Sequence, residues 1–599
     1  MALRTLTIAL EQGSAQSAQL PDAVEQAYLG GRGAIAWLLN ERITDEVAPL
    51  SEENLLVFAA GPLAGTQAYA SGGFVVGTRS PFTGGIAYSW AQGHWGAALR
   101  TAGHDLLVLE GVAPEWCWIQ IDGPKVAIRP VRRLQGLDAV TTAHALRDAL
   151  GEEYAVIALG PAGENNVAYS SIVAEGRYMA EPAGTGVVMA HKRVKAIAVR
   201  RGPEIPVVDE RRFHVALDLI KRRSEQSDLA EHIRNYGSTT FLLRAYAVGA
   251  LTGRNGQDGE PDDSLAHIRS SLALRGQLTS RGCIGCPVPC YSDYTRAHRT
   301  LPRPELELVA GFGARCGITR PDALIHIADL CLRLGIDPSA ASAAVAFLME
   351  CQQRDLYHNT NIPWGDEEAV FTALETLAKR QERRDVLSLG VGEMQEIFWQ
   401  SEVFAPQVKW MAQPALDPRA MHEIALAMAS SPIGGDYRYA MAYDELLDEL
   451  PSWLPEQGEG INETKAKVVR LIWHERLAAV LDAANLCRRL SLMAYQVTPA
   501  ELIALINAAT GLTMNGVDLV RLAERIITIE RLFLQKNGYE HATDHLPERW
   551  AETPLEEGKA AGKLPALSQM LADYYRRHGW DYHGNPTSER LQELGISAT

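Results

Sequence analysis

The sequence has no run of about 18 consecutive apolar residues, the length that a membrane-spanning helix requires, so no membrane span is expected. It has no excess of positive charge either. The 57 Lys and Arg residues against 73 Asp and Glu residues give a net charge of −16. Because nucleic acids and anionic membrane surfaces attract cations, neither is expected as a partner of this chain.

Cysteine is scarce, with 8 residues in 599. A disulfide framework needs a higher density of cysteine, so the thiols are expected to be reduced and the protein to be cytoplasmic. Signatures of several enzyme classes are also missing, because the chain has no P-loop lysine motif, no HExxH and no GxSxG. Gly184-Thr185-Gly186 is too short for a dinucleotide fingerprint, so nicotinamide binding is not expected.

Three of the cysteines are concentrated in one short segment, Cys283–Cys290 (CIGCPVPC). Its glycine and prolines oppose a helix, so the three thiols can point toward one volume. A [4Fe–4S] cluster needs four thiolates, and the candidate for the fourth is Cys487, at the end of a long amphipathic segment. Four thiolates also suit a structural zinc ion, although zinc ligands more often come as two CxxC pairs. The spacing therefore favours an iron–sulfur cluster over zinc.

The strand and helix patterns change near residue 208. Before it, short apolar runs bounded by turn residues, such as Asp105–Glu110 and Ala155–Gly160, predict strands of packed sheets, with few helices, near Ala23–Asn40 and Thr141–Leu150. After it, long segments such as Val468–Leu486 keep one apolar face and predict helices. A chain of 599 residues is too long for one core, so two to four domains are expected. The sequence thus predicts an α+β protein with a β-rich base.

Short motifs along the whole chain resemble the aldehyde ferredoxin oxidoreductase family. The resemblance runs from about residue 28 to 595, and it includes the CxxCPxxC segment and the DxxxLC segment that ends at Cys487. The other motifs are Gly30–Gly33 (GGRG), Ala59–Thr66 (AAGPLAGT), Arg79–Gly84 (RSPFTG), Gly160–Asn165 (GPAGEN), Asp573–Tyr575 (DYY), Gly579–Asp581 (GWD), Pro586–Thr587 (PT) and Leu591–Gly595 (LQELG). Together these motifs are specific.

The resemblance implies a β-rich N-terminal domain (1–208) that cradles a pterin, followed by two mostly helical domains (209–415 and 416–599), with the cofactor at their junction. That cofactor would be tungstopterin, a tungsten or molybdenum atom held by two pyranopterins, with Mg²⁺ bridging the pterin phosphates and a [4Fe–4S] cluster beside it. The implied activity is oxidation of a small aldehyde to a carboxylic acid. Electrons would leave to ferredoxin or a polyferredoxin-like subunit, and the resemblance also allows a homodimer.

The resemblance assigns roles residue by residue. The cluster ligands would be Cys283, Cys286, Cys290 and Cys487. The contacts to the pterins would be Trp90, Met179, Gly184, Ile336, Asp337, Asp482 and Leu486. Glu307 matches the family's acidic residue beside the metal, where a carboxylate can orient water or take a proton if burial raises its pKa. Without the resemblance, a solvated or paired glutamate would be the simpler interpretation.

This chain departs from the family pattern at several cationic positions. The segments Ser71–Phe74, Tyr178–Gly184 and Ile433–Tyr437 lack arginines that the family usually carries, and Tyr437 stands where the family has an active-site histidine. Buried phosphates need cations or backbone amides, so other arginines are expected to compensate. The candidates are Arg79, Arg100, Arg177, Arg193 and Arg438. Tyr437 is expected either to donate a hydrogen bond to an oxo group or substrate oxygen, or only to pack.

Three functions follow from this pattern. The leading hypothesis is a tungsten- or molybdenum-pterin enzyme that oxidises aldehydes. The second is a non-catalytic or electron-relay paralogue that keeps the fold and the cluster but lacks tungstopterin, which the missing arginines motivate. The third is a family member with altered, reductive chemistry, which the changed pocket residues Trp90, His94 and Tyr437 would permit. His94 is more often a hydrogen-bonded histidine than a metal ligand when, as here, it has no partner at short spacing.

Overall fold

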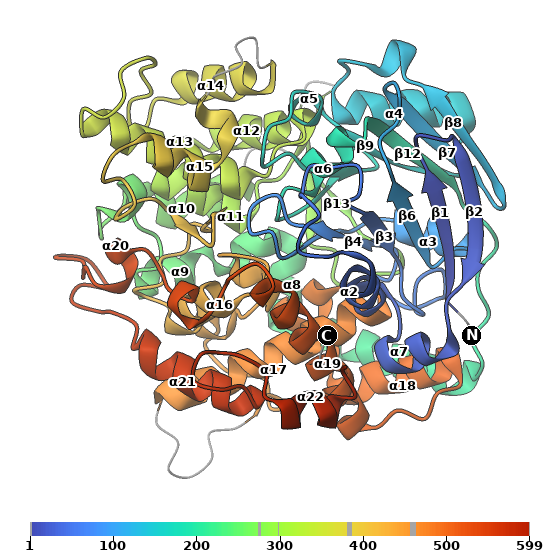
Figure 1. Cartoon of the computed structure of the whole chain (residues 1–599). Helices are drawn as coiled ribbons and strands as arrows, with labels where there is room; N and C mark the ends of the chain where they lie inside the picture. Colours follow the sequence, from blue (N-terminus) through green and yellow to red (C-terminus); the bar gives the residue numbers. More distant parts are fainter. Residues whose placement is uncertain (1–2, 274–276, 297–298, 380–385, 456–462, 598–599) are drawn as a thin grey trace.

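A computed structural model describes residues 3–273, 277–296, 299–379, 386–455 and 463–597. The fold is α+β, as predicted, with two six-stranded sheets near the N-terminus and mostly helices after them (Figure 1). The runs predicted as strands form β6 and β9, whereas the helix predicted near Ala23–Asn40 is divided into α1 (Asp22–Tyr28) and α2 (Gly31–Arg42). The predicted domain boundaries at 208 and 415 stay predictions.

The first sheet has one polar edge and a fully buried interior. β3, β4 and β5 are buried at every position, whereas the edge strand β2 (SAQSAQ) is exposed along its whole length, as its polar sequence dictates. β1 pairs in parallel with β6, and β3 pairs antiparallel with β6 and β4. In spatial order the strands are β2 (Ser14–Gln19), β1 (Arg4–Ala9), β6 (Leu106–Glu110), β3 (Leu56–Ala59), β4 (Phe74–Arg79) and β5 (Ile86–Ala91).

Two short helices that the sequence pattern did not predict, α3 (Trp95–Thr101) and α6 (Thr185–His191), contact strands of both large sheets. One apolar core therefore joins the first sheet, the second sheet and these helices, with Trp95 fully buried within it. In spatial order the second sheet contains β11 (Tyr178–Ala180), β10 (Ile172–Ala174), β9 (Tyr154–Leu159), β12 (Val194–Arg200), β7 (Cys117–Asp122) and β8 (Lys125–Pro130).

The two sheets meet at one edge, where β5 lies beside β11. The backbone N–H of Trp90 donates to the carbonyl of Glu181 at 3.0 Å across this junction. Both side chains therefore lie at the same end of the β-rich region, and both line the central cavity described below.

The helical part brings together segments that are far apart in the sequence. α7 packs against α18, and α17 packs against α2, α19 and α21 (Figure 1). The longer helices are α4 (Ala139–Leu150), α7 (Glu210–Gln226), α8 (Asp228–Tyr236), α10 (Ser264–Ala273), α12 (Pro321–Leu334), α13 (Pro338–Gln353), α14 (Glu367–Lys379), α16 (His422–Ser430), α17 (Glu463–Ala484), α18 (Pro499–Thr510), α19 (Gly516–Gln535) and α21 (Leu567–His578). In the described part of the chain, no helix combines the length and the apolarity needed to cross a bilayer.

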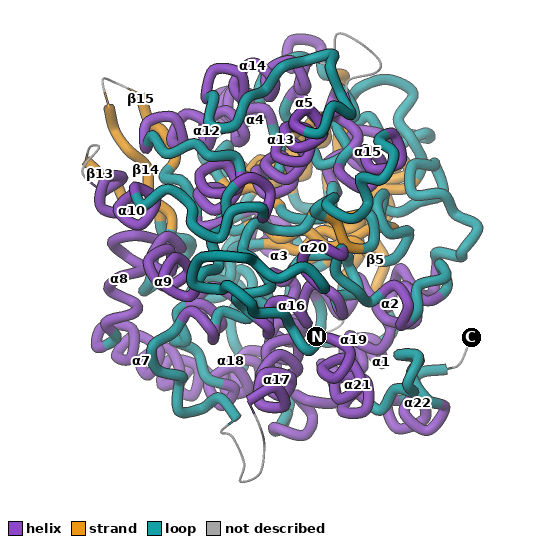
Figure 2. Tube along the Cα trace, turned by 90° about the vertical axis from the view of Figure 1, so that its left-hand side faces the viewer, coloured by secondary structure: helices purple, strands orange, loops and turns teal. Residues whose placement is uncertain are grey.

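A three-stranded sheet interrupts the helical part and was not expected from the sequence. It consists of β13 (Gln277–Arg281), β14 (Tyr291–Arg296) and β15 (Arg299–Pro302), and Figure 2 shows it at one edge of the molecule. The segment Cys283–Cys290 is the connection between β13 and β14. A hairpin connection rather than a helix therefore presents the three cysteines.

Glycines of the N-terminal motifs allow α2 and the β3–β4 connection to approach the end of α17. A Cβ atom on Gly31 would lie 2.0 Å from the carbonyl oxygen of Asp482, and one on Gly61 would lie 2.2 Å from the carbonyl oxygen of Ala483. No other residue type fits at such distances. This close approach places Asp482 and Cys487 at the edge of the β-rich region.

Candidate active site

The structure brings the four predicted cluster cysteines together. Cys283, Cys286, Cys290 and Cys487 line one small cavity with about 320 Å³ of empty space. Burial, and next the neighbouring thiols, raise the pKa of Cys283, and burial raises the pKa of Cys290 to about 11. All four are free cysteines. Four buried thiols that converge on one cavity are the donor set of a metal site, because a metal ion would stabilise their thiolate forms.

Cys487 reaches the cavity because its segment is held on the β-rich domain. The N–H of Cys487 donates to the carbonyl of Ala70 at 3.2 Å, and the N–H of Ala70 donates to the carbonyl of Ile284 at 2.7 Å. Asn485 has φ +65°, a left-handed conformation that glycine and asparagine adopt more readily than other residues. Its side-chain amide donates to the carbonyls of Ser71 and Gly73 at 2.6 and 2.9 Å. Asn485, where the resemblance leads one to expect glycine, therefore adopts a backbone conformation that glycine could also adopt.

The donor set fits a four-thiolate iron–sulfur cluster. Three of the thiols come from a CxxCxxxC segment and the fourth from the distant Cys487, and all four line one cavity. Zinc ligands more often come as two CxxC pairs, so this donor set is more typical of a [4Fe–4S] cluster.

A larger cavity lies next to the cysteines, with about 1140 Å³ of empty space. Two smaller cavities flank it, one beside Asp337 with about 360 Å³ and one beside Asp482 with about 300 Å³. Arg438 lines both the central cavity and the Asp337 cavity, whereas Gln92 lines the central, the Asp482 and the cysteine cavities. The four cavities therefore adjoin one another and share parts of their walls.

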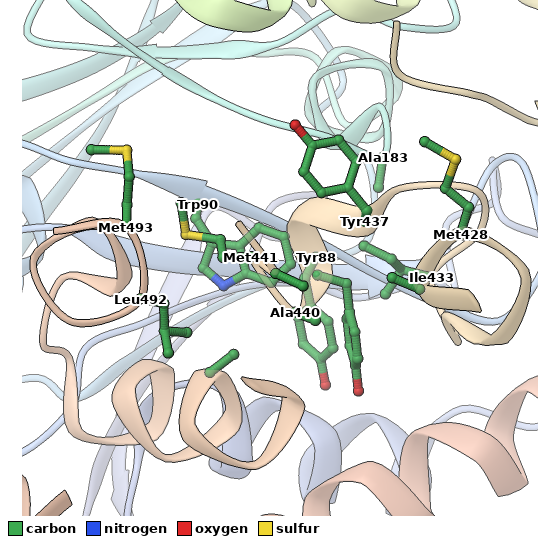
Figure 3. Close-up of a cluster of buried hydrophobic side chains, with 14 of the residues drawn as sticks. Tyr88, Trp90, Ala183, Met428, Ile433, Tyr437, Ala440, Met441, Leu492 and Met493 are labelled. Carbon is green, nitrogen blue, oxygen red and sulfur yellow. The ribbon is translucent and has the colours of Figure 1, made fainter. Parts of the chain in front are cut away.

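Six of the seven residues predicted to contact the pterins line these cavities: Trp90, Met179, Gly184, Asp337, Asp482 and Leu486. Trp90 and Met441 lie side by side on the central wall (Figure 3). Ile336 is fully buried in the core, pairs with Ser170 through the backbone, and lines none of the four cavities. Each side cavity therefore has one buried aspartate on its wall.

Arg438 lies beside Asp337 on the wall of the Asp337 cavity. Its guanidinium donates to Asp436 at 2.6 Å and to Glu181 at 2.9 Å, and it lies 3.8 Å from Asp337. Asp337 also begins α13, because its Oδ1 accepts the N–H groups of Ser339 and Ala340. Burial, and next Asp337 as a like charge, raise the pKa of Glu181 well above its ordinary value. Three carboxyl groups therefore share one guanidinium here.

Asp482 is paired with cations on both sides. The Nε of Arg488 lies 3.2 Å from Asp482, and an Nη of Arg32 lies 3.3 Å from it. The guanidinium of Arg488 also stacks at 3.8 Å over the ring of Trp90, on the wall of the central cavity. Arg32 belongs to the GGRG motif and also pairs with Glu530 at 2.8 Å.

Only part of the expected cationic compensation is found at the cavities. Of the five arginines proposed from the sequence, Arg177 and Arg438 line the central cavity. The guanidinium groups of the other three bond mainly to backbone carbonyls elsewhere, and these are Arg79, Arg100 and Arg193. The cavity wall instead has three arginines that the sequence analysis missed, Arg303, Arg488 and Arg489. In the sequence, the pair Arg488-Arg489 directly after the predicted ligand Cys487 could have indicated two of these three arginines.

Glu307 lies on the wall of the central cavity, and Tyr437 stands behind it. The hydroxyl of Tyr437 donates to Oε1 of Glu307, and the N–H of Ala415 donates to Oε2 at 3.3 Å. Figure 3 shows the Tyr437 hydroxyl pointing to the opposite side from that of Tyr88. Tyr437 is fully buried and is not among the residues lining the central cavity. The expected contact of Tyr437 with a substrate or oxo group is therefore replaced by a contact with Glu307.

Burial raises the pKa of Glu307, and the Arg438 charge and the Tyr437 hydrogen bond oppose that rise. Glu307 stands just before a π-helical segment, Val309–Arg315, and a second one, Arg489–Met493, follows Cys487. Such widened turns occur frequently at functional sites. His94, by contrast, places its Nδ1 2.9 Å from Glu175 and lines none of the four cavities.

Comparisons with known proteins agree with this geometry. The sequence patterns described as "Aldehyde ferredoxin oxidoreductase, N-terminal domain" and "Aldehyde ferredoxin oxidoreductase, domains 2 & 3" match residues 5–201 and 215–596. The chain is 30% identical to the tungsten-containing aldehyde ferredoxin oxidoreductase of Pyrococcus furiosus, across 99% of this chain and 98% of that one. It is 24% identical to the WOR-like subunit of an aliphatic sulfonate oxidoreductase from the same organism, across 99% and 96% of the two chains.

Among solved structures, the chain is similar to the active site complex BamBC of benzoyl coenzyme A reductase in complex with 1,5-dienoyl-CoA. The TM-score is 0.86 and the identity 25%, and the match covers 100% of this chain and 98% of the other. Two family patterns that together span nearly all of the sequence, and a 30% identical relative of the same length, lead to one conclusion. This chain belongs to the aldehyde ferredoxin oxidoreductase family of tungsten-containing oxidoreductases.

Proposed function

We propose that this chain holds a tungsten or molybdenum bis-pterin and a [4Fe–4S] cluster, oxidises an aldehyde to a carboxylic acid, and passes the electrons to a ferredoxin-type protein. One observation carries the proposal. A central cavity with a buried carboxyl on its wall adjoins two side cavities, each with a buried aspartate, and a cavity lined by four thiols. Membership of the family supports the same assignment.

The residues that line the central and side cavities suit the cofactor that the family implies. When bound, the tungsten bis-pterin supplies the two-electron chemistry. Asp337 and Asp482 would each hold one pterin from a side cavity, and Arg438 and Arg488 stand beside them to neutralise phosphate groups. Mg²⁺ bridging those phosphates would use backbone and phosphate oxygens and would need no further side-chain cation.

Glu307 is the residue proposed to move a proton. Oxidation of an aldehyde by water yields the acid, two electrons and two protons, so a base at the reacting carbon is needed. Glu307 lines the central cavity, and burial raises the pKa of its carboxyl above the ordinary value. Tyr437, which donates to Oε1, would fix the orientation of that carboxylate and leave Oε2 toward Ala415. Tyr437 is therefore proposed as a positioning residue.

A reductive reaction is the second candidate, and one observation favours it. The chain is similar, with a TM-score of 0.86, to the BamBC complex of a benzoyl coenzyme A reductase. Tyr437 in place of a histidine leaves Glu307 without a neighbouring imidazole, which changes how protons are supplied. A non-catalytic relay is less well supported, because the candidate pterin contacts Asp337 and Asp482 are retained, each in a side cavity that adjoins the central one.

Elemental analysis of anaerobically purified protein, followed by activity assays, tests these proposals. The expected result is about four iron atoms and one tungsten or molybdenum atom per chain, with reduction of a viologen dye by a panel of aldehydes. Iron without tungsten or molybdenum would favour the relay. Metal in both sites with no aldehyde activity, but with oxidation of a reduced dye by an aryl thioester, would favour the reductive reaction.

Glu307→Gln should abolish turnover and keep the metals, whereas Glu164→Gln, outside these cavities, should retain both.

A further inference from the structure

Arg489 stands on the partition between the central cavity and the cysteine cavity, and its side chain lines both. Its guanidinium is fixed on two sides. Two nitrogens donate to the two carboxylate oxygens of Glu305, at 3.0 and 2.5 Å, and the group lies 4.8 Å from the centre of the Tyr291 ring. A bidentate pair with a ring beneath it leaves the guanidinium little freedom.

The same guanidinium reaches the thiol cavity. Arg489 lines that cavity together with Cys283, Cys286, Cys290 and Cys487. Burial raises the pKa of Cys290 and of Cys487, and the positive charge of Arg489 opposes that larger rise. The neighbouring cations are engaged differently. Arg488 pairs with Asp482 and stacks on the ring of Trp90. The Nη groups of Arg303 donate to the backbone carbonyls of Asn235 and Cys290. Among the described residues, Arg489 is therefore the side-chain cation that lines both the cysteine cavity and the central cavity.

We propose that Arg489 is a positioning residue that raises the reduction potential of the cluster and thereby favours electron flow from the central cavity to it. The proposal rests on the proposed function, because it requires the cluster. One electron added to a four-thiolate cluster adds one negative charge, which a fixed guanidinium on the wall of the cysteine cavity stabilises. Each turnover releases two electrons, which pass one at a time through the cluster to an external iron–sulfur protein.

A variant of Glu305 tests the effect of Arg489 on the cluster potential independently. The Glu305 carboxylate holds Arg489 and partly cancels its charge at the cluster. Removing the carboxylate charge should therefore shift the cluster potential in the direction opposite to removing the guanidinium charge. If the pair served only to hold the fold together, breaking it from either side would have similar consequences, so opposite shifts are diagnostic.

The experiment measures the midpoint potential of the cluster in the anaerobic holoenzyme by paramagnetic resonance at a series of fixed potentials. Arg489→Gln should shift the potential to more negative values, Arg489→Lys should shift it less, and Glu305→Gln should shift it to more positive values. Arg549→Gln is the matched control. Arg549 also donates twice to a carboxylate, Glu350, at 2.6 Å and lies over an aromatic ring, yet it lines neither cavity, so its loss should leave the potential unchanged.

An unchanged potential in Arg489→Gln with the cluster intact would overturn the proposal, as would shifts of equal sign in Arg489→Gln and Glu305→Gln. If Arg489→Gln fails to retain its cluster, the Arg489→Lys and Glu305→Gln variants decide, and the absence of a positive shift in Glu305→Gln overturns the proposal. Failure of the unaltered protein to hold any cluster would instead refute the proposed function.

Discussion

Replacing Tyr437 with phenylalanine tests the acid–base role of Glu307 directly. The substitution removes one hydroxyl that donates to Oε1 of Glu307 and keeps the buried ring. A hydrogen bond to a charged group contributes ~1.5–3 kcal/mol, which corresponds to ~10- to 150-fold in the ratio of ionised to protonated carboxyl at a given pH. The bond from the Ala415 N–H remains in the variant, so the lower part of that range is expected.

The sign follows from the direction of the pKa shift. Burial raises the pKa of Glu307, and the Tyr437 hydroxyl counteracts it by stabilising the carboxylate. Without the hydroxyl the pKa rises further, so a base that must be ionised loses its proton only at higher pH. The acidic limb of kcat/KM against pH should therefore move toward higher pH, and the rate on that limb should fall about tenfold or more at fixed pH.

The assay is dye-linked aldehyde oxidation by the anaerobic holoenzyme, measured across the acidic range for the unaltered protein and for Tyr437→Phe. Tyr574→Phe is the control, because Tyr574 also donates from a buried hydroxyl to a buried carboxylate, Glu475, at 2.9 Å, but lines none of the four cavities. An acidic limb that stays in place in Tyr437→Phe, or that moves equally in Tyr574→Phe, would refute the assignment of Glu307 as the base.

Three further predictions concern the framework of the site. Cys487→Ala should lower the iron content well below about four atoms per chain in metal analysis, whereas Cys331→Ala, a buried cysteine outside the cavity, should retain the iron. Asn485→Ala should lower the free energy of unfolding by about 2–4 kcal/mol, because alanine disfavours φ +65° and two buried carbonyls lose their donor. Asn485→Gly should lower it less, because glycine tolerates this φ and only the two hydrogen bonds are lost. Arg32→Leu should lower stability by about 3–5 kcal/mol by leaving the buried Glu530 uncompensated, and an unchanged unfolding midpoint would contradict that pairing.

The departures from the family pattern have a common physical explanation in the structure. Positive charge that the chain lacks at the usual positions is restored from the segment after Cys487, through Arg488 and Arg489, and from Arg303 and Arg438. Electrostatic compensation depends on where a charge lies in space and not on its position in the sequence. Matching residues one by one to a family pattern therefore overstates the loss.

Some of this protein was fixed by the sequence alone. The change from short β-type runs to long amphipathic segments determined the α+β class, because strand and helix periodicities are local properties. The glycine motifs were recognised only as marks of the family resemblance, and the structure adds that Gly31 and Gly61 approach the backbone of Asp482 and Ala483. The pairing of a CxxCxxxC segment with a distant DxxxLC segment was also readable as a pattern.

Other features were decided only by tertiary structure. α3 and α6 are too short for a clear periodic signal, and packing against both sheets makes them helical. The hydroxyl of Tyr437 turns to Glu307, and Ile336 lies in the core, because neighbouring chain segments determine where a side chain points. Which arginines face the cavities likewise depends on the folding of distant segments against one another. Long-range electrostatics and packing have no counterpart in a local sequence pattern, and they decide the chemistry of this site.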